Sequence, residues 1–128
     1  MSEEIGGGAA RVLVVEDEFF IALDLSERLE DAGFLVAGPA AAVAEALRLL
    51  DEAPCDIAVL DIHLGPRETS EPVALELAAR NIPFVTVTGF SHEQRPPGYN
   101  GAPLLSKPVR PDELLAALSL SLEKARAG

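Results

Sequence analysis

The sequence contains few of the residues that cross-link small domains. One of its 128 residues is cysteine and two are histidine, so an intramolecular disulfide is impossible and zinc could not be held by cysteine and histidine alone. A chain of this kind is typical of a reducing compartment. The first ten residues carry acidic rather than basic side chains and no apolar segment, unlike a secretory signal peptide. We therefore predict a cytoplasmic protein in which residues 1–10 form a flexible tail.

Basic residues are scarce as well. Lys and Arg number 10 against 21 Asp and Glu, which gives a formal net charge of −11. Proteins that bind nucleic acid gain affinity when Lys and Arg displace counterions from phosphates, so a nucleic acid partner is disfavoured. Long hydrophobic runs are also missing, because the most apolar stretch, residues 33–50, is interrupted by Pro39, Glu45 and Arg48. We predict no membrane-spanning segment.

Short apolar runs alternate along the chain with patterns of helical spacing. The runs predict strands at 12–15, 34–37, 57–60, 83–87 and 104–105. Apolar residues at four-residue spacing predict a first helix that ends at Gly33 and a last helix that begins at Pro111, and helices are also predicted over 41–50 and 73–80. The predicted fold is α/β: a flavodoxin-like (βα)5 three-layer sandwich over residues 11–126, with a parallel five-stranded sheet in the order 2-1-3-4-5.

The region between the fourth and fifth strands departs from this alternation. A fourth crossover helix is expected there, but the prolines and glycines of residues 89–101 leave room for little more than a turn or two. We therefore predict a fourth helix that is short or irregular.

Polar side chains stand where four of the predicted strands end. The carboxyl ends of parallel strands share one edge of a sheet, which is where ligands of open α/β sheets bind. Carboxylates there suit Mg2+, an aspartate can accept a phosphoryl group as a nucleophile, and a lysine and a hydroxyl can neutralise and position phosphoryl oxygens. The residues that provide these groups are Glu16, Asp17, Glu18, Asp61, Thr88 and Lys107.

Four motifs in this order resemble those of response-regulator receiver domains of two-component signalling. They are VLVVEDE at 12–18, DIAVLDIHLG at 56–65, PFVTVTGF at 83–90 and SKP at 106–108. The resemblance runs from about Arg11 to the last helix, nearly the whole chain. It implies a phosphoacceptor domain that receives a phosphoryl group from a sensor histidine kinase or a histidine phosphotransfer protein and then changes a partner-binding surface.

The resemblance also implies a role for each site residue. Asp61 would be the phosphoacceptor, and Thr88 and Lys107 would bind the phosphoryl oxygens, with a cis peptide bond between Lys107 and Pro108. Mg2+ would be held by Glu16, Asp17, Asp61 and the main-chain carbonyl of His63. Such a domain performs only self-phosphorylation and autodephosphorylation, and we expect a monomer or a weak phosphorylation-dependent dimer.

Two departures from the usual receiver pattern concern signal output. Leu104 or Leu105 stands in the fifth strand where receivers commonly carry an aromatic switch residue. PFVTVTGF and the shortened segment after it resemble an alphaproteobacterial subgroup whose motif is written F-A-T-G-Y, with Val87 where alanine is usual. Members are often free-standing receivers or are fused to atypical kinases and stress-response regulators. We expect phosphorylation to reorganise residues 91–102 and the start of the last helix, and to expose or reshape a surface that includes Phe90 and Tyr99.

Two other functions share part of this chemistry. A small Mg2+-dependent phosphatase with an aspartate nucleophile would carry a general acid two residues later, as in D-x-D, whereas this chain has Asp61-Ile62-His63. It would also have a segment that encloses the substrate. A flavodoxin would place a hydroxyl-rich phosphate loop after the first strand, where the acidic EDE would repel phosphate. The phosphatase is the nearer alternative.

Overall fold

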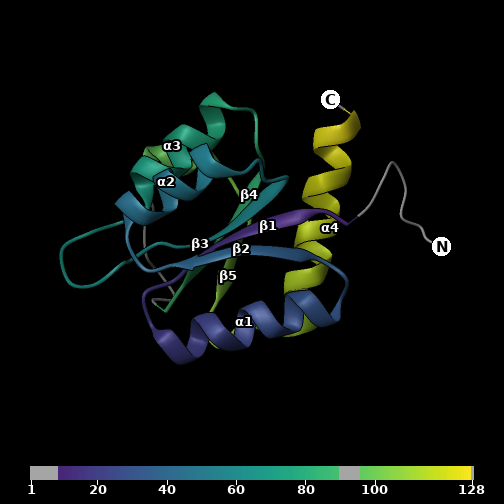
Figure 1. Ribbon diagram of the computed structural model, residues 1–128, viewed down its shortest axis with the longest axis horizontal. Coiled ribbons are helices and arrows are strands. Elements are labelled where there is room, and N and C mark those ends of the chain that lie inside the picture. The colour runs from purple at the N-terminus through teal and green to yellow at the C-terminus, as the bar shows by residue number, and fades with distance from the viewer. Residues whose placement is uncertain (1–8, 90–95, 128) are drawn as a thin grey trace.

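The computed structural model describes residues 9–89 and 96–127, so Phe90 and most of the predicted tail lie outside the described residues. Five parallel strands form one sheet in the order β2-β1-β3-β4-β5, which confirms the predicted fold (Figure 1). The elements in chain order are β1 (Arg11–Val15), α1 (Phe19–Asp31), β2 (Leu35–Ala40), α2 (Val43–Glu52), β3 (Ile57–Asp61), α3 (Glu71–Ala79), β4 (Phe84–Thr88), the 3₁₀ helix η1 (Pro97–Tyr99), β5 (Leu104–Ser106) and α4 (Pro111–Ala127).

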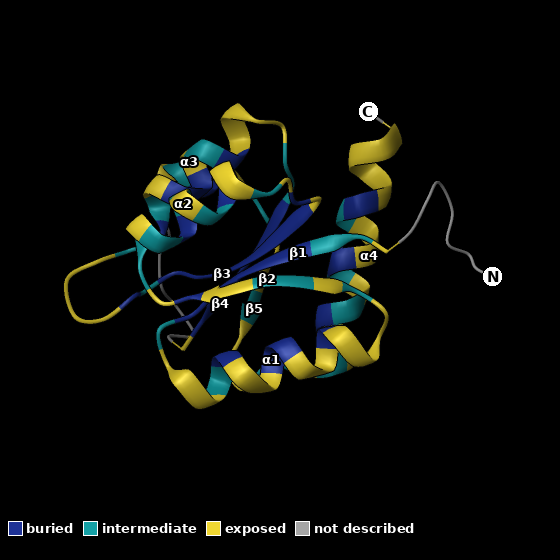
Figure 2. Cartoon of the chain, in the orientation of Figure 1, coloured by how far each residue is buried: buried dark blue, intermediate teal, exposed yellow. Residues whose placement is uncertain are grey.

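The helices cover both faces of the sheet, with α2 and α3 on one side and α1 and α4 on the other (Figure 1). The central strands β3 and β4 are buried along their whole length (Figure 2). Burial on both faces explains the apolar run Ile57–Leu60 of β3, whereas β4 alternates apolar residues with the buried Thr86 and Thr88. Successive side chains of β1 enter opposite cores, because side chains alternate across a strand. Leu13 and Val15 lie in the core beside α2 and α3, and Val12 and Val14 lie in the core beside α1 and α4.

Strand β2 is longer than the sequence predicts. It continues past Ala37 to Ala40 through Gly38 and Pro39, which are joined by a cis peptide bond. A glycine and a proline argue against a central strand, but β2 lies at the edge of the sheet, where a missing N–H is tolerated. Gly38 has a positive φ of 95°, and a Cβ there would lie 2.8 Å from the backbone nitrogen of Ala40. Only glycine fits this position without strain.

The predicted irregular segment before β5 is confirmed in its described part. Over residues 96–103 the chain forms only η1 and a turn through Asn100 and Gly101, both with positive φ. Tyr99, which we expect phosphorylation to expose or reposition, is 1% exposed in this structure and belongs to the core beside α2 and α3. None of the described helices is long and apolar enough to cross a membrane.

Candidate functional site

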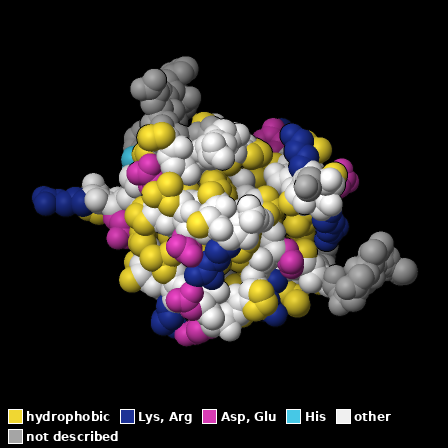
Figure 3. Space-filling model, turned by 90° about the horizontal axis from the view of Figure 1, so that it is seen from above, with side chains coloured by type: hydrophobic (Ala, Val, Ile, Leu, Met, Phe, Trp, Pro, Cys, Tyr) yellow, Lys and Arg dark blue, Asp and Glu magenta, His cyan; other side chains and the backbone are white. Residues whose placement is uncertain are grey.

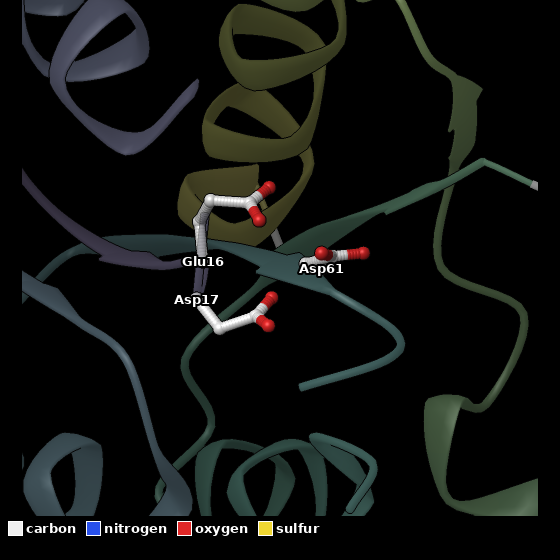
Figure 4. A group of neighbouring side chains, drawn as sticks. All are labelled: Glu16, Asp17 and Asp61. Carbon is white, nitrogen blue, oxygen red and sulfur yellow. The ribbon is translucent and has the colours of Figure 1, made fainter. Parts of the chain in front are cut away.

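Three carboxylates lie together beyond the ends of two neighbouring strands. Strands β1 and β3 pair with Val15 beside Leu60, so Glu16 and Asp17 follow one strand close to Asp61 at the end of the other. One oxygen from each carboxylate lies within 4.8 Å of the others, and all three groups point toward the same space (Figure 4). Glu16 and Asp61 are buried, and Asp17 is half-buried. Such a cluster favours a bound cation, because its like charges would otherwise repel one another at close range.

Lys107 provides positive charge at this cluster. Its Nζ lies 3.0 Å from Asp61 Oδ2, 3.1 Å from Glu16 Oε1 and 3.4 Å from Glu18 Oε1. Burial by itself would lower the pKa of Lys107, but its hydrogen bonds and charge interactions with Asp61 and Glu16 outweigh burial and raise that pKa. The backbone of Lys107 is fixed as well, since its N–H donates to the carbonyl oxygen of Thr88 at 2.8 Å. The ammonium group is therefore charged and held in place at neutral pH.

Burial raises the pKa of Glu16 to about 7. A hydrogen bond that the Glu18 N–H donates to Glu16 Oε2 at 3.1 Å acts against this shift, whereas the nearby charge of Asp61 adds to it. The other oxygen, Oε1, is buried, and Lys107 Nζ lies 3.1 Å from it as its charged partner. Glu16 Oε1 is thus a buried acceptor with capacity for a further ligand.

A cleft of about 220 Å³ opens over these groups. The residues that line it are Asp17, Glu18, Asp61, His63, Gly65, Gly89 and Lys107. Thr88 is buried at the end of β4, and its neighbour Gly89 forms the wall in its place. Glu18, which the sequence placed among the polar residues at the strand ends, lines the cleft. The sequence did not single out Gly65, although the loop after Asp61 contained the signal. The peptide bond between Lys107 and Pro108 is cis, as the resemblance implied.

A larger groove lies elsewhere, between the end of α3, the beginnings of β4 and β5, and the last part of α4. Its volume is about 690 Å³, and Lys124 is the one charged residue among the described residues that line it. The smaller acidic cleft, at the carboxyl ends of the strands, contains the carboxylates and the ammonium group that could take part in a reaction. Cys55 lines neither cavity, and burial followed by the charge of Asp56 raises the pKa of its thiol to about 11, so the thiol is protonated at neutral pH.

The sheet order and the acidic cleft with its lysine define a flavodoxin-like α/β domain of the receiver type. The chain belongs to the response regulator receiver domain family, whose sequence profile matches residues 12–119. It is a phosphoacceptor signalling domain, and the function predicted from the sequence is confirmed at this level.

Comparisons with individual proteins agree with this family assignment. The transcriptional regulatory protein PdtaR of Mycobacterium tuberculosis is 32% identical over 120 residues, which are 91% of this chain and 58% of PdtaR, so the chain spans less than two thirds of that relative. The solution structure of SdrG from Sphingomonas melonis Fr1 is 38% identical, covers 89% of this chain and 96% of its own, and superposes with a TM-score of 0.77. A response regulator from Burkholderia pseudomallei, solved with a phosphorylated aspartic acid, a calcium ion and citrate, is 25% identical with a TM-score of 0.77, covering 92% of this chain and 71% of its own.

Proposed function

We propose that Asp61 is the residue that accepts the phosphoryl group. The observation that supports this assignment is the placement of its carboxylate in the cleft, 3.0 Å from Lys107 Nζ and within 4.8 Å of the Glu16 and Asp17 carboxylates. An oxygen of Asp61 attacks the phosphorus of a phosphohistidine, a P–O bond forms and the P–N bond breaks. The imidazole leaves with the electron pair and takes up a proton.

Lys107 and Thr88 act on the product of this reaction. The phosphorylated aspartate carries more negative charge than the free carboxylate, and Lys107 is the nearest cation among the described residues. Its ammonium group would turn from Asp61 Oδ2 to a phosphoryl oxygen. Thr88 directly precedes Gly89 in the cleft wall, so a small backbone movement would bring its hydroxyl to another phosphoryl oxygen.

The residues of the cleft also fit a magnesium ion. Oxygen ligands are the ones that Mg2+ prefers, and the three clustered carboxylates include the buried Glu16 Oε1, which can accept a further ligand. Glu16, Asp17, Asp61 and the main-chain carbonyl of His63 would hold the ion. When bound, Mg2+ would supply positive charge to the phosphoryl oxygens during transfer. The solved relative with a phosphorylated aspartic acid and a calcium ion supports this part of the proposal.

The surface beside the cleft supports a protein as the phosphodonor. Phe19 and Phe20 directly follow the cleft residue Glu18, are 68% and 80% exposed, and pack edge to face with ring centroids 5.3 Å apart. Two exposed aromatic rings on the residues next to a cleft residue offer an apolar contact for a partner that must bring its histidine to Asp61. The donor would be a sensor histidine kinase or a histidine phosphotransfer protein.

The remaining parts of the proposal concern the partner type, the location, the subgroup and the oligomeric state, and they rest mainly on the sequence. On the face seen in Figure 3, basic side chains are scattered among acidic and hydrophobic ones rather than gathered into a patch, which agrees with a protein partner rather than nucleic acid. We include a cytoplasmic location, membership of the F-A-T-G-Y subgroup, and a monomer or weak phosphorylation-dependent dimer. The domain turns over no substrate other than its own phosphoryl group, which separates it from the phosphatase alternative.

Incubation with acetyl phosphate tests the proposal. Intact-mass measurement is expected to show the addition of one phosphoryl group in the presence of Mg2+ and little addition in EDTA. Peptide mapping after borohydride reduction should place the modification at Asp61. Modification of another residue would overturn the assignment, and steady release of phosphate from an added phosphomonoester would indicate the phosphatase instead.

A further inference from the structure

Two chain segments lead away from the cleft and meet again at the beginning of α3. One follows Asp61 at the end of β3, and the other follows Thr88 at the end of β4. At their meeting point Ser70 Oγ and Tyr99 Oη lie 2.8 Å apart in a buried hydrogen bond. Directly beside it, the Gly98 N–H donates to Glu71 Oε2 at 2.9 Å. Two adjacent residues of the α3 terminus therefore hold two adjacent residues of η1.

Tyr99 occupies core space that a crossover helix would otherwise cover. Ser70 is 0% and Tyr99 1% exposed, and Tyr99 is the largest of the fully buried side chains. The close approach of η1 to α3 depends on Gly98, because a Cβ at this position would lie 2.6 Å from the Glu71 Cγ. The contact is thus built for this position and is not a chance meeting of two surface loops.

Hydrogen bonds connect this contact to the phosphoacceptor. Ile62, which follows Asp61, donates its N–H to the carbonyl oxygen of Val87 and accepts a hydrogen bond from the Ser70 N–H, both at 2.9 Å. Ile62 therefore ties the residue before Thr88 to the residue that bonds Tyr99. A shift at the ends of β3 and β4 changes the position of the Ser70 hydroxyl directly.

Loss of the Ser70 hydrogen bond would carry a free-energy cost, because both hydroxyl groups are buried and a buried polar group that gives up a hydrogen bond is not compensated by water. The side chain of Tyr99 can leave the core through the 690 Å³ groove, because Tyr99 lines this groove together with Ile82 and Ala102. The turn after it, at Asn100 and Gly101, already has left-handed backbone and packs nothing closely against the Gly101 Cβ position.

We propose that the Ser70–Tyr99 and Glu71–Gly98 hydrogen bonds form a latch that holds the unphosphorylated state and is released when Asp61 is phosphorylated. On release, Tyr99 leaves the core and enters the groove between α3 and α4. This inference rests on the proposed role of Asp61. It assigns the output movement to Tyr99, where the usual aromatic position of the fifth strand holds leucine.

The composition of the chain provides a direct probe. Tyr99 is the single tyrosine and the chain has no tryptophan, so intrinsic fluorescence excited at tyrosine wavelengths comes from Tyr99. Acrylamide quenching is expected to be weak in the free protein and severalfold stronger after addition of beryllofluoride, a phosphoryl mimic. Bound fluoride is followed in parallel by ¹⁹F NMR. A bound-fluoride signal with unchanged or weaker quenching would overturn the latch while leaving the phosphoacceptor intact.

Variants of the latch residues test whether weakening the latch strengthens the binding of beryllofluoride. Because coupling is reciprocal, Ser70→Ala should bind beryllofluoride about fivefold more tightly than the parent, since the loss of one hydrogen bond weakens only the latched state. Tyr99→Phe should behave alike in the ¹⁹F titration. Thr86→Val removes another buried hydroxyl, which donates to the Pro103 carbonyl oxygen at 2.8 Å, and is the control: it should lose stability without tighter binding. Equal affinities in all variants would overturn the latch, and a parent that binds no fluoride would overturn both the latch and the role of Asp61.

Discussion

Lys107 Nζ lies 3.0 Å from Asp61 Oδ2, although 46 residues separate the two in the chain and β4 lies between their strands. The lysine side chain is long enough to extend past one strand. The hydrogen bond from the Lys107 N–H to the Thr88 carbonyl oxygen fixes the position of the Lys107 backbone. The acidic cleft thus contains its own cation. This pair determines the behaviour expected of variants at either residue.

Asp61→Asn is expected to abolish phosphoryl uptake, because an amide is not a nucleophile at phosphorus. The thermal midpoint should stay equal or rise, since one of three clustered carboxylates loses its charge while Lys107 keeps Glu16 as a partner. Intact-mass analysis after acetyl phosphate and a thermal melt check the two parts. Uptake of a phosphoryl group at the parental level would show that Asp61 is not the acceptor.

Lys107→Ala is expected to destabilise the domain by about 2 kcal/mol in EDTA, because buried carboxylates lose a charged hydrogen-bond partner. Added Mg2+ should restore more stability to this variant than to the parent. The amide signals of Thr88 and Gly89 should respond weakly to beryllofluoride, because the cation for the phosphoryl oxygens is missing. Chemical shifts identical to those of the parent would remove Lys107 from the response.

Asp17→Asn is expected to weaken Mg2+ binding by about tenfold and to slow phosphorylation and hydrolysis together. Its carboxylate is the most exposed of the three in the cluster, so folding should change little. Isothermal titration measures the affinity. Asp24→Asn on α1 is the control, because Asp24 does not line the cleft and its carboxylate accepts a hydrogen bond from Arg28 at 3.0 Å. Equal Mg2+ affinity in both variants would exclude Asp17 from the ion's ligands.

The pKa of Glu16 predicts a pH-dependent stability. Burial raises it from the usual 4.5 to about 7, so between these values the folded protein binds a proton that the unfolded chain has lost. Stability without metal should therefore be highest below about pH 4.5, as far as this group contributes, and fall by at most about 3 kcal/mol as the pH rises to 7. Urea unfolding in EDTA at several pH values measures the slope. Glu16→Gln should flatten it, and an unchanged slope would contradict the assignment.

The sequence predicted the parallel sheet because β1 and β3 contain continuous apolar runs at 12–15 and 57–60, and it predicted the cleft because polar residues follow the strands. It did not predict the continuation of β2 through Gly38 and Pro39, since local rules for strands cannot anticipate that an edge position tolerates them. The burial of Tyr99 was also missed. Its environment depends on Ser70 and Glu71, which lie far from it in the chain, and on the absence of a side chain at Gly98.

Phe20→Ala is expected to separate phosphorylation by a protein from phosphorylation by a small molecule. The ring is 80% exposed, so its loss should change the free energy of unfolding by less than about 0.5 kcal/mol and leave the reaction with acetyl phosphate at the parental rate. Transfer from a phosphorylated histidine kinase or phosphotransfer protein should slow about tenfold, because the proposed aromatic contact for the donor is removed. Leu75→Ala is the matched control, since Leu75 is 54% exposed on α3 and does not line the cleft. Stopped-flow transfer with the same donor compares the three proteins, and equal slowing in both variants would show that Phe20 has no special part in docking the donor.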